Sequence, residues 1–266
     1  MKKFNRLHIF KKGCIIILLN SIFKGETKMK KILCLFVLCC VAVGLVACFG
    51  GGETTTTTTE KKPDEVTVLT WSEFMQTEDD APIVIEGYVQ GKQSWWADKC
   101  SLYLQDENGG YFVYELTCSE EDYARLTVGT KIRVTGYKTS WADLHEVASG
   151  ATFEIVDGSY VAEPVDLTDK LGTEELFNYQ TTLVEFKGLT VVSIEYKNGA
   201  PGDDIYVTVS YNGAEYDFCV ERYLTGPETE VYTTVGALVA GDVIDVVGFA
   251  YWYNGINTHI TNVTVK

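Results

Sequence analysis

Basic residues are scarce in this sequence of 266 residues. Nine of the 22 Lys and Arg residues and one of the 37 Asp and Glu residues precede Cys48, so 13 positive and 36 negative residues follow it. Contacts to the phosphates of nucleic acids draw on Lys and Arg. The composition therefore predicts that nucleic acid is disfavoured as a partner, and an excess of acid also keeps an exposed protein in solution.

Residues that carry catalytic or metal chemistry are also scarce. Only two His residues follow Cys48, namely His145 and His259, and each lies in a pattern typical of a strand. The sequence contains no nucleophile elbow, no His or Cys spacing typical of a metal site and no phosphate-binding loop. We therefore expect no enzyme, no metal site and no cofactor.

One run without any charge, residues 32–47, follows Met29-Lys30-Lys31. A basic start, a short apolar run and small residues before a cut are typical of a signal peptide, here 29–47, and the run is shorter than the roughly 20 residues of a spanning helix. Its end, Leu45-Val46-Ala47-Cys48, resembles the lipobox of bacterial lipoproteins. The resemblance implies a lipid on Cys48 and a place on the extracytoplasmic face of a bacterial membrane. An ordinary signal peptide with a chance Cys and a helix of a folded core are the alternatives.

The segments on either side of the signal peptide have no pattern of a folded domain. Residues 1–28 are interpreted as a mis-called leader, because Met29 opens the signal peptide and Lys24-Gly25-Glu26 can be encoded by a purine-rich ribosome-binding sequence. Residues 48–62 contain the lipidated Cys and a run of Gly and Thr that cannot bury enough apolar surface to fold. We expect a flexible tether there.

The rest of the chain contains an internal repeat. Residues 126–136 read LTVGTKIRVTG and residues 238–248 read LVAGDVIDVVG, with Leu, Gly, Ile, Val and Gly at the same spacing. The alternation predicts a half-buried strand in each copy. We expect one domain over 63–160 and a second over 165–266.

Each copy is predicted to have five strands, with a short helix between the third and the fourth. This order is that of the OB-fold, a small Greek-key barrel. The predicted fold class is all-β with short helices, as two tandem five-stranded OB-like barrels. The stretches IVIEGYV, LYLQDENGGYFVY and VGTKIRVTG of the first copy resemble the OB modules of bacterial surface lipoproteins and those appended to secreted nucleases. These are turn and core positions, so the resemblance implies a fold and not a function.

The first hairpin can be aligned from its apolar residues. A three-residue loop at 108–110 sets Leu102 opposite Leu116, which keeps apolar side chains together. The same register sets Cys100 opposite Cys118. A disulfide between them and a pair of buried free thiols both remain open.

The second hairpin has a tighter turn signal, Asn212-Gly213, between two strand-like runs. A two-residue loop there sets Cys219 opposite Tyr206. The sequence therefore predicts that Cys219 is a free thiol.

Aromatic residues gather where OB barrels bind ligands. That place is the face of strands 2 and 3, between the loop joining strands 1 and 2 and the loop joining strands 4 and 5. Exposed aromatic rings stack on sugars, bases or proline-rich peptides, although such rings can also fold down and cap the barrel. The candidate ligand-binding residues are Trp95, Trp96, Tyr103, Trp141 and Trp252.

These observations predict a lipid-anchored, non-catalytic binding module of a bacterial envelope. The expected partners are the membrane, through the lipid, and a glycan or a partner protein. The alternatives are an accessory OB protein that binds nucleic acid and a structural adaptor of an envelope assembly.

Overall fold

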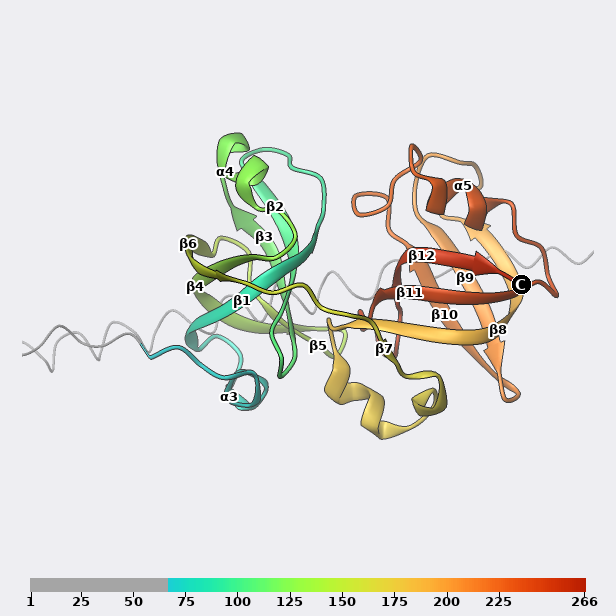
Figure 1. Cartoon of the computed structure of the whole chain (residues 1–266), viewed down its shortest axis with the longest axis horizontal. Helices are drawn as coiled ribbons and strands as arrows, with labels where there is room; N and C mark the ends of the chain where they lie inside the picture. Colours follow the sequence, from blue (N-terminus) through green and yellow to red (C-terminus); the bar gives the residue numbers. More distant parts are fainter. Residues whose placement is uncertain (1–66) are drawn as a thin grey trace, which may run out of the picture. The chain divides into compact units, whose positions relative to one another are not determined.

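The computed structural model describes residues 67–266, in which a short helix is followed along the chain by two six-stranded sheets (Figure 1). The predicted leader, the signal peptide, Cys48 and the tether, together residues 1–62, all lie outside the described residues. The helix, α3 (Trp71–Gln76), begins at Thr70, and the Thr70 and Glu73 side chains cap each other's backbone N–H groups. Within 67–266, no helix is long and apolar enough to cross a membrane.

The first sheet closes into a barrel. Its strand order is β1-β2-β3-β5-β4-β6, and an additional pairing of β1 with β4 joins the ends of a five-stranded ring. A short helix, α4, lies between β3 and β4 along the chain, which is the predicted OB order. The bounds are β1 (Pro82–Lys92), β2 (Lys99–Gln105), β3 (Gly110–Thr117), α4 (Glu120–Arg125), β4 (Thr130–Trp141), β5 (Leu144–Val147) and β6 (Thr152–Ser159).

The second sheet repeats this plan. Its order is β11-β12-β10-β9-β8-β7, and the pairing of β11 with β8 closes the ring. Two 3-10 helices, η1 (Thr168–Lys170) and η2 (Glu174–Tyr179), lie between β7 and β8 along the chain, and α5 again separates the third strand of the ring from the fourth. The bounds are β7 (Val165–Asp166), β8 (Leu183–Tyr196), β9 (Ile205–Tyr211), β10 (Ala214–Val220), α5 (Glu230–Gly236), β11 (Val243–Phe249) and β12 (His259–Val265). The predicted fold class is confirmed.

The two glycines that precede the fourth strand, Gly129 and Gly241, have the same backbone conformation and the same hydrogen bond in both barrels. Gly129 and Gly241 have φ angles of 88° and 96°, a region that favours glycine. The N–H of Gly129 donates to the carbonyl of Val89, and the N–H of Gly241 donates to that of Val191. The motif therefore ties the start of the fourth strand to the first strand of the same barrel.

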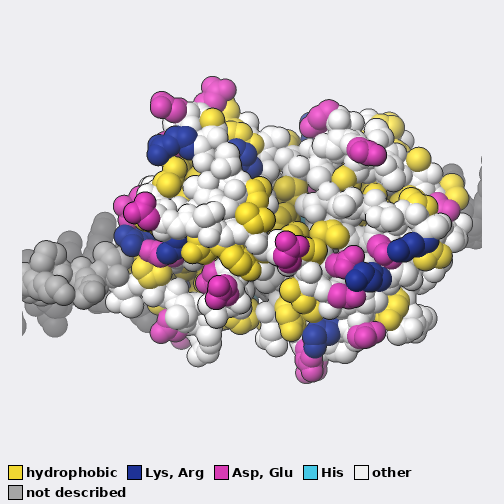
Figure 2. Space-filling view, viewed as in Figure 1, with side chains coloured by type: hydrophobic (Ala, Val, Ile, Leu, Met, Phe, Trp, Pro, Cys, Tyr) yellow, Lys and Arg dark blue, Asp and Glu magenta, His cyan; other side chains and the backbone are white. Residues whose placement is uncertain are grey.

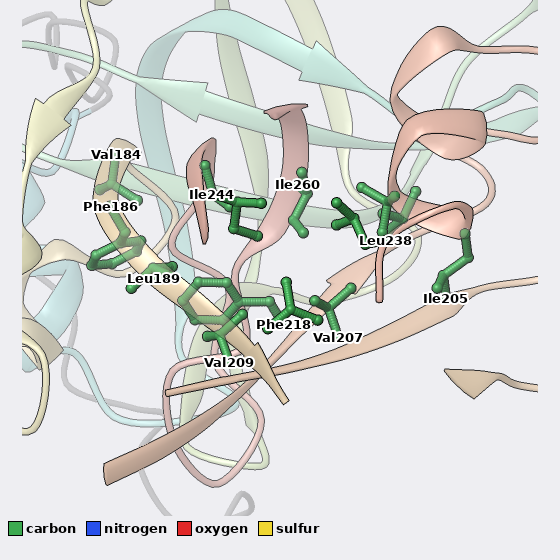
Figure 3. Close-up of a cluster of buried hydrophobic side chains, with 14 of the residues drawn as sticks. Val184, Phe186, Leu189, Ile205, Val207, Val209, Phe218, Leu238, Ile244 and Ile260 are labelled. Carbon is green, nitrogen blue, oxygen red and sulfur yellow. The ribbon is translucent and has the colours of Figure 1, made fainter. Parts of the chain in front are cut away.

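Each barrel has its own apolar core. The second core contains 19 buried residues from all five strands of its ring and from α5 (Figure 3). Burial of apolar surface on this scale is the main force that holds such a barrel together. The residues labelled in the close-up are Val184, Phe186, Leu189, Ile205, Val207, Val209, Phe218, Leu238, Ile244 and Ile260.

The predicted register of the first hairpin is wrong. Leu102 lies opposite Val113, because the loop has four residues, 106–109. A bulge between Cys100 and Leu102 then shifts the register, so Cys100 lies opposite Leu116 and not opposite Cys118. The Asp106 carboxylate makes the loop, since it accepts the N–H groups of both Asn108 and Gly109.

The predicted register of the second hairpin is confirmed. Ala214 pairs with Tyr211 across a two-residue turn, and Cys219 lies opposite Tyr206. Asn212 and Gly213 both have positive φ, as this tight turn requires.

Candidate ligand-binding surface

The two barrels meet at an aromatic seam. Tyr103, Phe112 and Leu144 of the first barrel and Phe249 of the second form one buried cluster. The Tyr103 and Phe249 rings stack with centroids 4.3 Å apart and planes inclined by 13°. The Phe249 ring lies on Gly91, where an added Cβ would come within 2.6 Å of it. The seam is therefore packed as closely as a core.

Polar contacts also cross the seam. The Tyr103 hydroxyl lies 2.6 Å from Nδ1 of His259. Gln105 accepts the N–H of Leu183, and Gln180 donates to the carbonyl of Asp143. Burial lowers the pKa of His259 to about 3, so the ring is neutral at neutral pH.

The seam covers the face of the first barrel that OB-folds use for ligands. Tyr103 and Phe112 are opposite each other on β2 and β3, the second and third strands. Tyr103 is fully buried. A ligand cannot reach this predicted site residue unless the barrels separate.

The equivalent face of the second barrel is open. Successive side chains of a strand point to opposite faces, and residues paired across neighbouring strands lie on the same face. Glu195 pairs with Tyr206, Tyr206 with Cys219, and Cys219 with His259, so these four residues form one row across the sheet. A groove of about 640 Å³ runs along this face. We call it the β9–β10 groove; its lining residues are Gln93, Phe112, Tyr114, Ser193, Glu195, Asp204, Tyr206, Thr208, Asp217, Cys219, Glu221, Tyr251, Tyr253, Asn257 and His259.

A smaller cleft of about 260 Å³ lies where the β1–β2 loop meets the loop after β10. The backbone N–H of Ser94 donates to the carbonyl of Tyr223 and joins the two loops. Trp96, Tyr114 and Tyr223 line this cleft and are 57%, 42% and 50% exposed. We call it the seam cleft; its other lining residues are Gln93, Ser94, Cys100, Ser101 and Glu115.

Two cations lie against rings of the seam cleft. The Lys99 ammonium is 4.5 Å from the centre of the Trp96 ring, and the Arg222 guanidinium is 4.9 Å from that of Tyr223. Both contacts are within the range of a cation–π interaction. Figure 2 shows that Lys and Arg are interspersed with Asp and Glu over the face in view.

The remaining predicted tryptophans lie in different surroundings. Trp95 is half-buried, and its Nε1 donates to the carbonyl of Cys118. Trp141 is 61% exposed but lines neither the groove nor the seam cleft. Trp252 packs edge-on against Phe177 at 5.4 Å. Of the predicted ligand residues, only Trp96 lines either of these two hollows.

Cys100 and Cys118 come together despite the changed register. Their Sγ atoms are 3.4 Å apart and both residues are buried. Burial raises the pKa of both thiols. The structure holds them as free thiols, so their oxidation remains a prediction.

Two carboxyl groups of this region are withdrawn from water: Glu221, which lines the groove and is half-buried, and Glu146, which is buried. Burial raises the pKa of Glu221 and of Glu146 to about 7. Each group therefore keeps its proton to a higher pH than an exposed carboxyl group does.

Four exposed tyrosines of this surface were not predicted: Tyr114, Tyr206, Tyr223 and Tyr253. Tyr206 had a usable signal, because it alternates with the buried Ile205 and Val207 and so faces outward. The other tyrosines follow no pattern that separates them from packing residues.

No protein-family model matches the sequence, and no curated protein matches it. The chain has the strand order of an OB-fold. The solved structures to which it is similar include proteins bound to DNA. A murine DNA-binding protein with double-stranded DNA is 13% identical, with 69% of this chain and 94% of that chain covered and a TM-score of 0.34. The HINa domain of Ifi202 with 20-base-pair DNA is 10% identical, with 71% and 96% covered and a TM-score of 0.32. A replication protein A heterotrimer with single-stranded DNA is 12% identical, with 69% and 50% covered and a TM-score of 0.28.

The prediction that net charge disfavours nucleic acid is contradicted by these DNA-bound neighbours. The physical reason lies in what net charge measures. It sums the whole chain, whereas a ligand meets a local surface, and Lys99 and Arg222 lie beside exposed rings at the seam cleft. The acidic composition is therefore no ground for excluding nucleic acid.

Proposed function

We propose that this chain is a non-catalytic binding module that holds an oligomeric ligand by stacking its flat rings on Trp96, Tyr114 and Tyr223. The observation that carries the proposal is the convergence of these three exposed rings on one cleft at the seam. Exposed aromatic rings in a hollow lose unfavourable contact with water when a ligand covers them.

Single-stranded nucleic acid is the first ligand class that this arrangement supports. OB-folds hold it by stacking bases on aromatic side chains, at about 1–3 kcal/mol per base. Lys99 and Arg222 add positive charge beside two of the three rings. Their charge is partly offset, because Lys99 also pairs with Glu115 at 2.8 Å, so we expect a moderate dependence on salt.

A neutral glycan is the second candidate, and a separate observation favours it. Besides the rings and Glu115, which is paired with Lys99, the seam cleft is lined by the uncharged polar side chains of Gln93, Ser94 and Ser101. Sugars offer hydroxyl groups to such side chains and an apolar face to aromatic rings. OB-folds bind oligosaccharides as well as oligonucleotides.

Binding titrations test this function. The protein is mixed with single-stranded oligonucleotides at low and high salt and with neutral oligosaccharides, and tryptophan fluorescence is followed. We expect Trp96→Ala and Tyr223→Ala each to weaken binding by about 5-fold or more, because each removes one stacking partner worth about 1–3 kcal/mol.

Trp141→Ala is the matched control, since Trp141 is as exposed as Trp96 but lies outside the seam cleft. Binding that survives Trp96→Ala and Tyr223→Ala would contradict the site. Equal loss in Trp141→Ala would instead place the ligand at the β4–β5 turn. If neither oligonucleotides nor oligosaccharides show saturable binding to the protein, the proposed function is wrong.

We also propose that the module is anchored to a bacterial membrane by a lipid on Cys48. The support is the signal-like run 29–47 and the lipobox-like residues before Cys48. Two acyl chains are enough for stable anchoring. Mass spectrometry of the protein from its native membrane should give an N-terminal peptide that begins at lipidated Cys48, whereas a peptide from residues 1–28 would contradict this processing.

A further inference from the structure

The β9–β10 groove differs in chemistry from the seam cleft. Its lining residues include four acidic residues, Glu195, Asp204, Asp217 and Glu221, and no Lys or Arg. Asp204 is already paired with Lys197 at 2.8 Å. Within residues 67–266, Glu195 and Asp217 form no ion pair, and Asp217 accepts only the hydroxyl of Thr208 on one oxygen. Two carboxylates of the groove therefore remain open to a positive group.

Aromatic rings surround these carboxylates. Tyr206 and Tyr253 are 40% and 58% exposed at the rim, and Tyr114 is 42% exposed at the side shared with the seam cleft. Tyr251 and Phe112 lie deeper. The faces of such rings attract cations, and more strongly when water is excluded. The groove thus combines ring faces with negative charge.

The floor of the groove adds polar groups without positive charge. His259 and Cys219 line it and are both more than nine-tenths buried. Tyr103 occupies Nδ1 of His259, and in the described part of the chain Nε2 has no hydrogen-bond partner. Burial lowers the pKa of His259 to about 3, so the ring does not repel a cation at neutral pH. The His259 ring also stacks on Tyr251 at 4.1 Å, which fixes both rings.

We propose that the β9–β10 groove is a binding site for an organic cation, an ammonium or guanidinium group. The cation lies between the rings of Tyr206 and Tyr253 and against the carboxylates of Glu195 and Asp217. The site is separate from the stacking rings Trp96 and Tyr223, so it stands even if the proposed function at the seam cleft fails. The group is carried either by a small amine or by a Lys or Arg side chain of a peptide.

Calorimetric titration of the full-length protein tests the site. The probes are tetramethylammonium, spermidine, and the blocked amides of lysine and arginine, all at one ionic strength. We expect saturable binding of at least one probe, and at least a 10-fold loss of affinity in the double variant Glu195→Gln, Asp217→Asn. Preference for spermidine or for the amino-acid amides distinguishes a small amine from a peptide as the source.

The control is the double variant Glu121→Gln, Glu174→Gln, which removes the same charge from exposed positions outside the groove. Tyr253→Ala should also lose affinity, while Tyr253→Phe, which keeps the ring, should retain it. Glu195 and Asp217 are exposed, so an unchanged circular dichroism spectrum is expected for the groove variant. Absence of saturable binding at millimolar probe, or equal loss in the control variant, overturns the proposal. The variant Glu195→Gln, Asp217→Asn should still bind the oligonucleotide or oligosaccharide at the seam cleft. Its loss of cation binding can therefore be told apart from a failure of the function proposed for the seam cleft.

Discussion

Phe249→Ala is expected to lower the free energy of unfolding by about 3–5 kcal/mol, the usual range for removing a buried Phe. Phe249 is 2% exposed, stacks on Tyr103 and lies on Gly91. Its loss leaves a cavity between two barrels whose own cores stay intact, so the seam should open before either barrel unfolds. Urea unfolding followed by fluorescence and by circular dichroism measures both effects.

Tyr137→Ala is the control for this experiment, because Tyr137 is an aromatic residue that is 59% exposed. Its effect should stay within about 0.5 kcal/mol, as is usual for surface positions. A loss below about 1 kcal/mol in Phe249→Ala would mean that the seam contributes little. In that case the two barrels would be independent units joined only by the chain.

Mild oxidation is expected to join Cys100 to Cys118 and to stabilise the protein by about 3 kcal/mol, the value for closing a loop of this size. The Sγ atoms are 3.4 Å apart and the residues are 18 positions apart in the sequence, so a small side-chain movement brings them to the bond length of about 2.05 Å. Oxidising compartments outside the cytoplasm favour such bonds. The melting temperature should fall by about 6–12 °C when a reductant is added, given about 2–4 °C per kcal/mol at this chain length.

Two single variants make the oxidation experiment specific. Cys118→Ser should remove the effect of the reductant, whereas Cys219→Ser should keep it, since Cys219 lies in the other barrel. Mass spectrometry after alkylation identifies the joined residues. Two alkylated thiols at Cys100 and Cys118 after oxidation would show that the pair stays reduced.

The fold was predictable because its signals are local. Gly129 and Gly241 stand at the same point of two matching stretches, and each needs a positive φ to tie the fourth strand to the first. The turn at Asn212-Gly213 sets its own register for the same reason, since those residue types favour it. Patterns of this kind depend on a few neighbouring residues.

The site was less predictable because its signals are not local. Tyr103 and Tyr206 both lie on the second strand of a barrel and face outward, yet the other barrel covers the first and leaves the second 40% exposed. Nothing in the residues around either tyrosine separates the two cases. The bulge beside Ser101 is similar: the Ser101 hydroxyl accepts the N–H of Glu115, 14 positions away.

The seam also sets how many ligands one molecule can hold. Because the two barrels have the same fold, the molecule could bind two ligands if the face of the second and third strands were free in both barrels. Docking uses up that face in the first barrel, because Tyr103 and Phe112 meet Phe249 and Tyr251 there. Each chain is thus monovalent at this face, and any gain in avidity has to come from several chains crowded on the same surface.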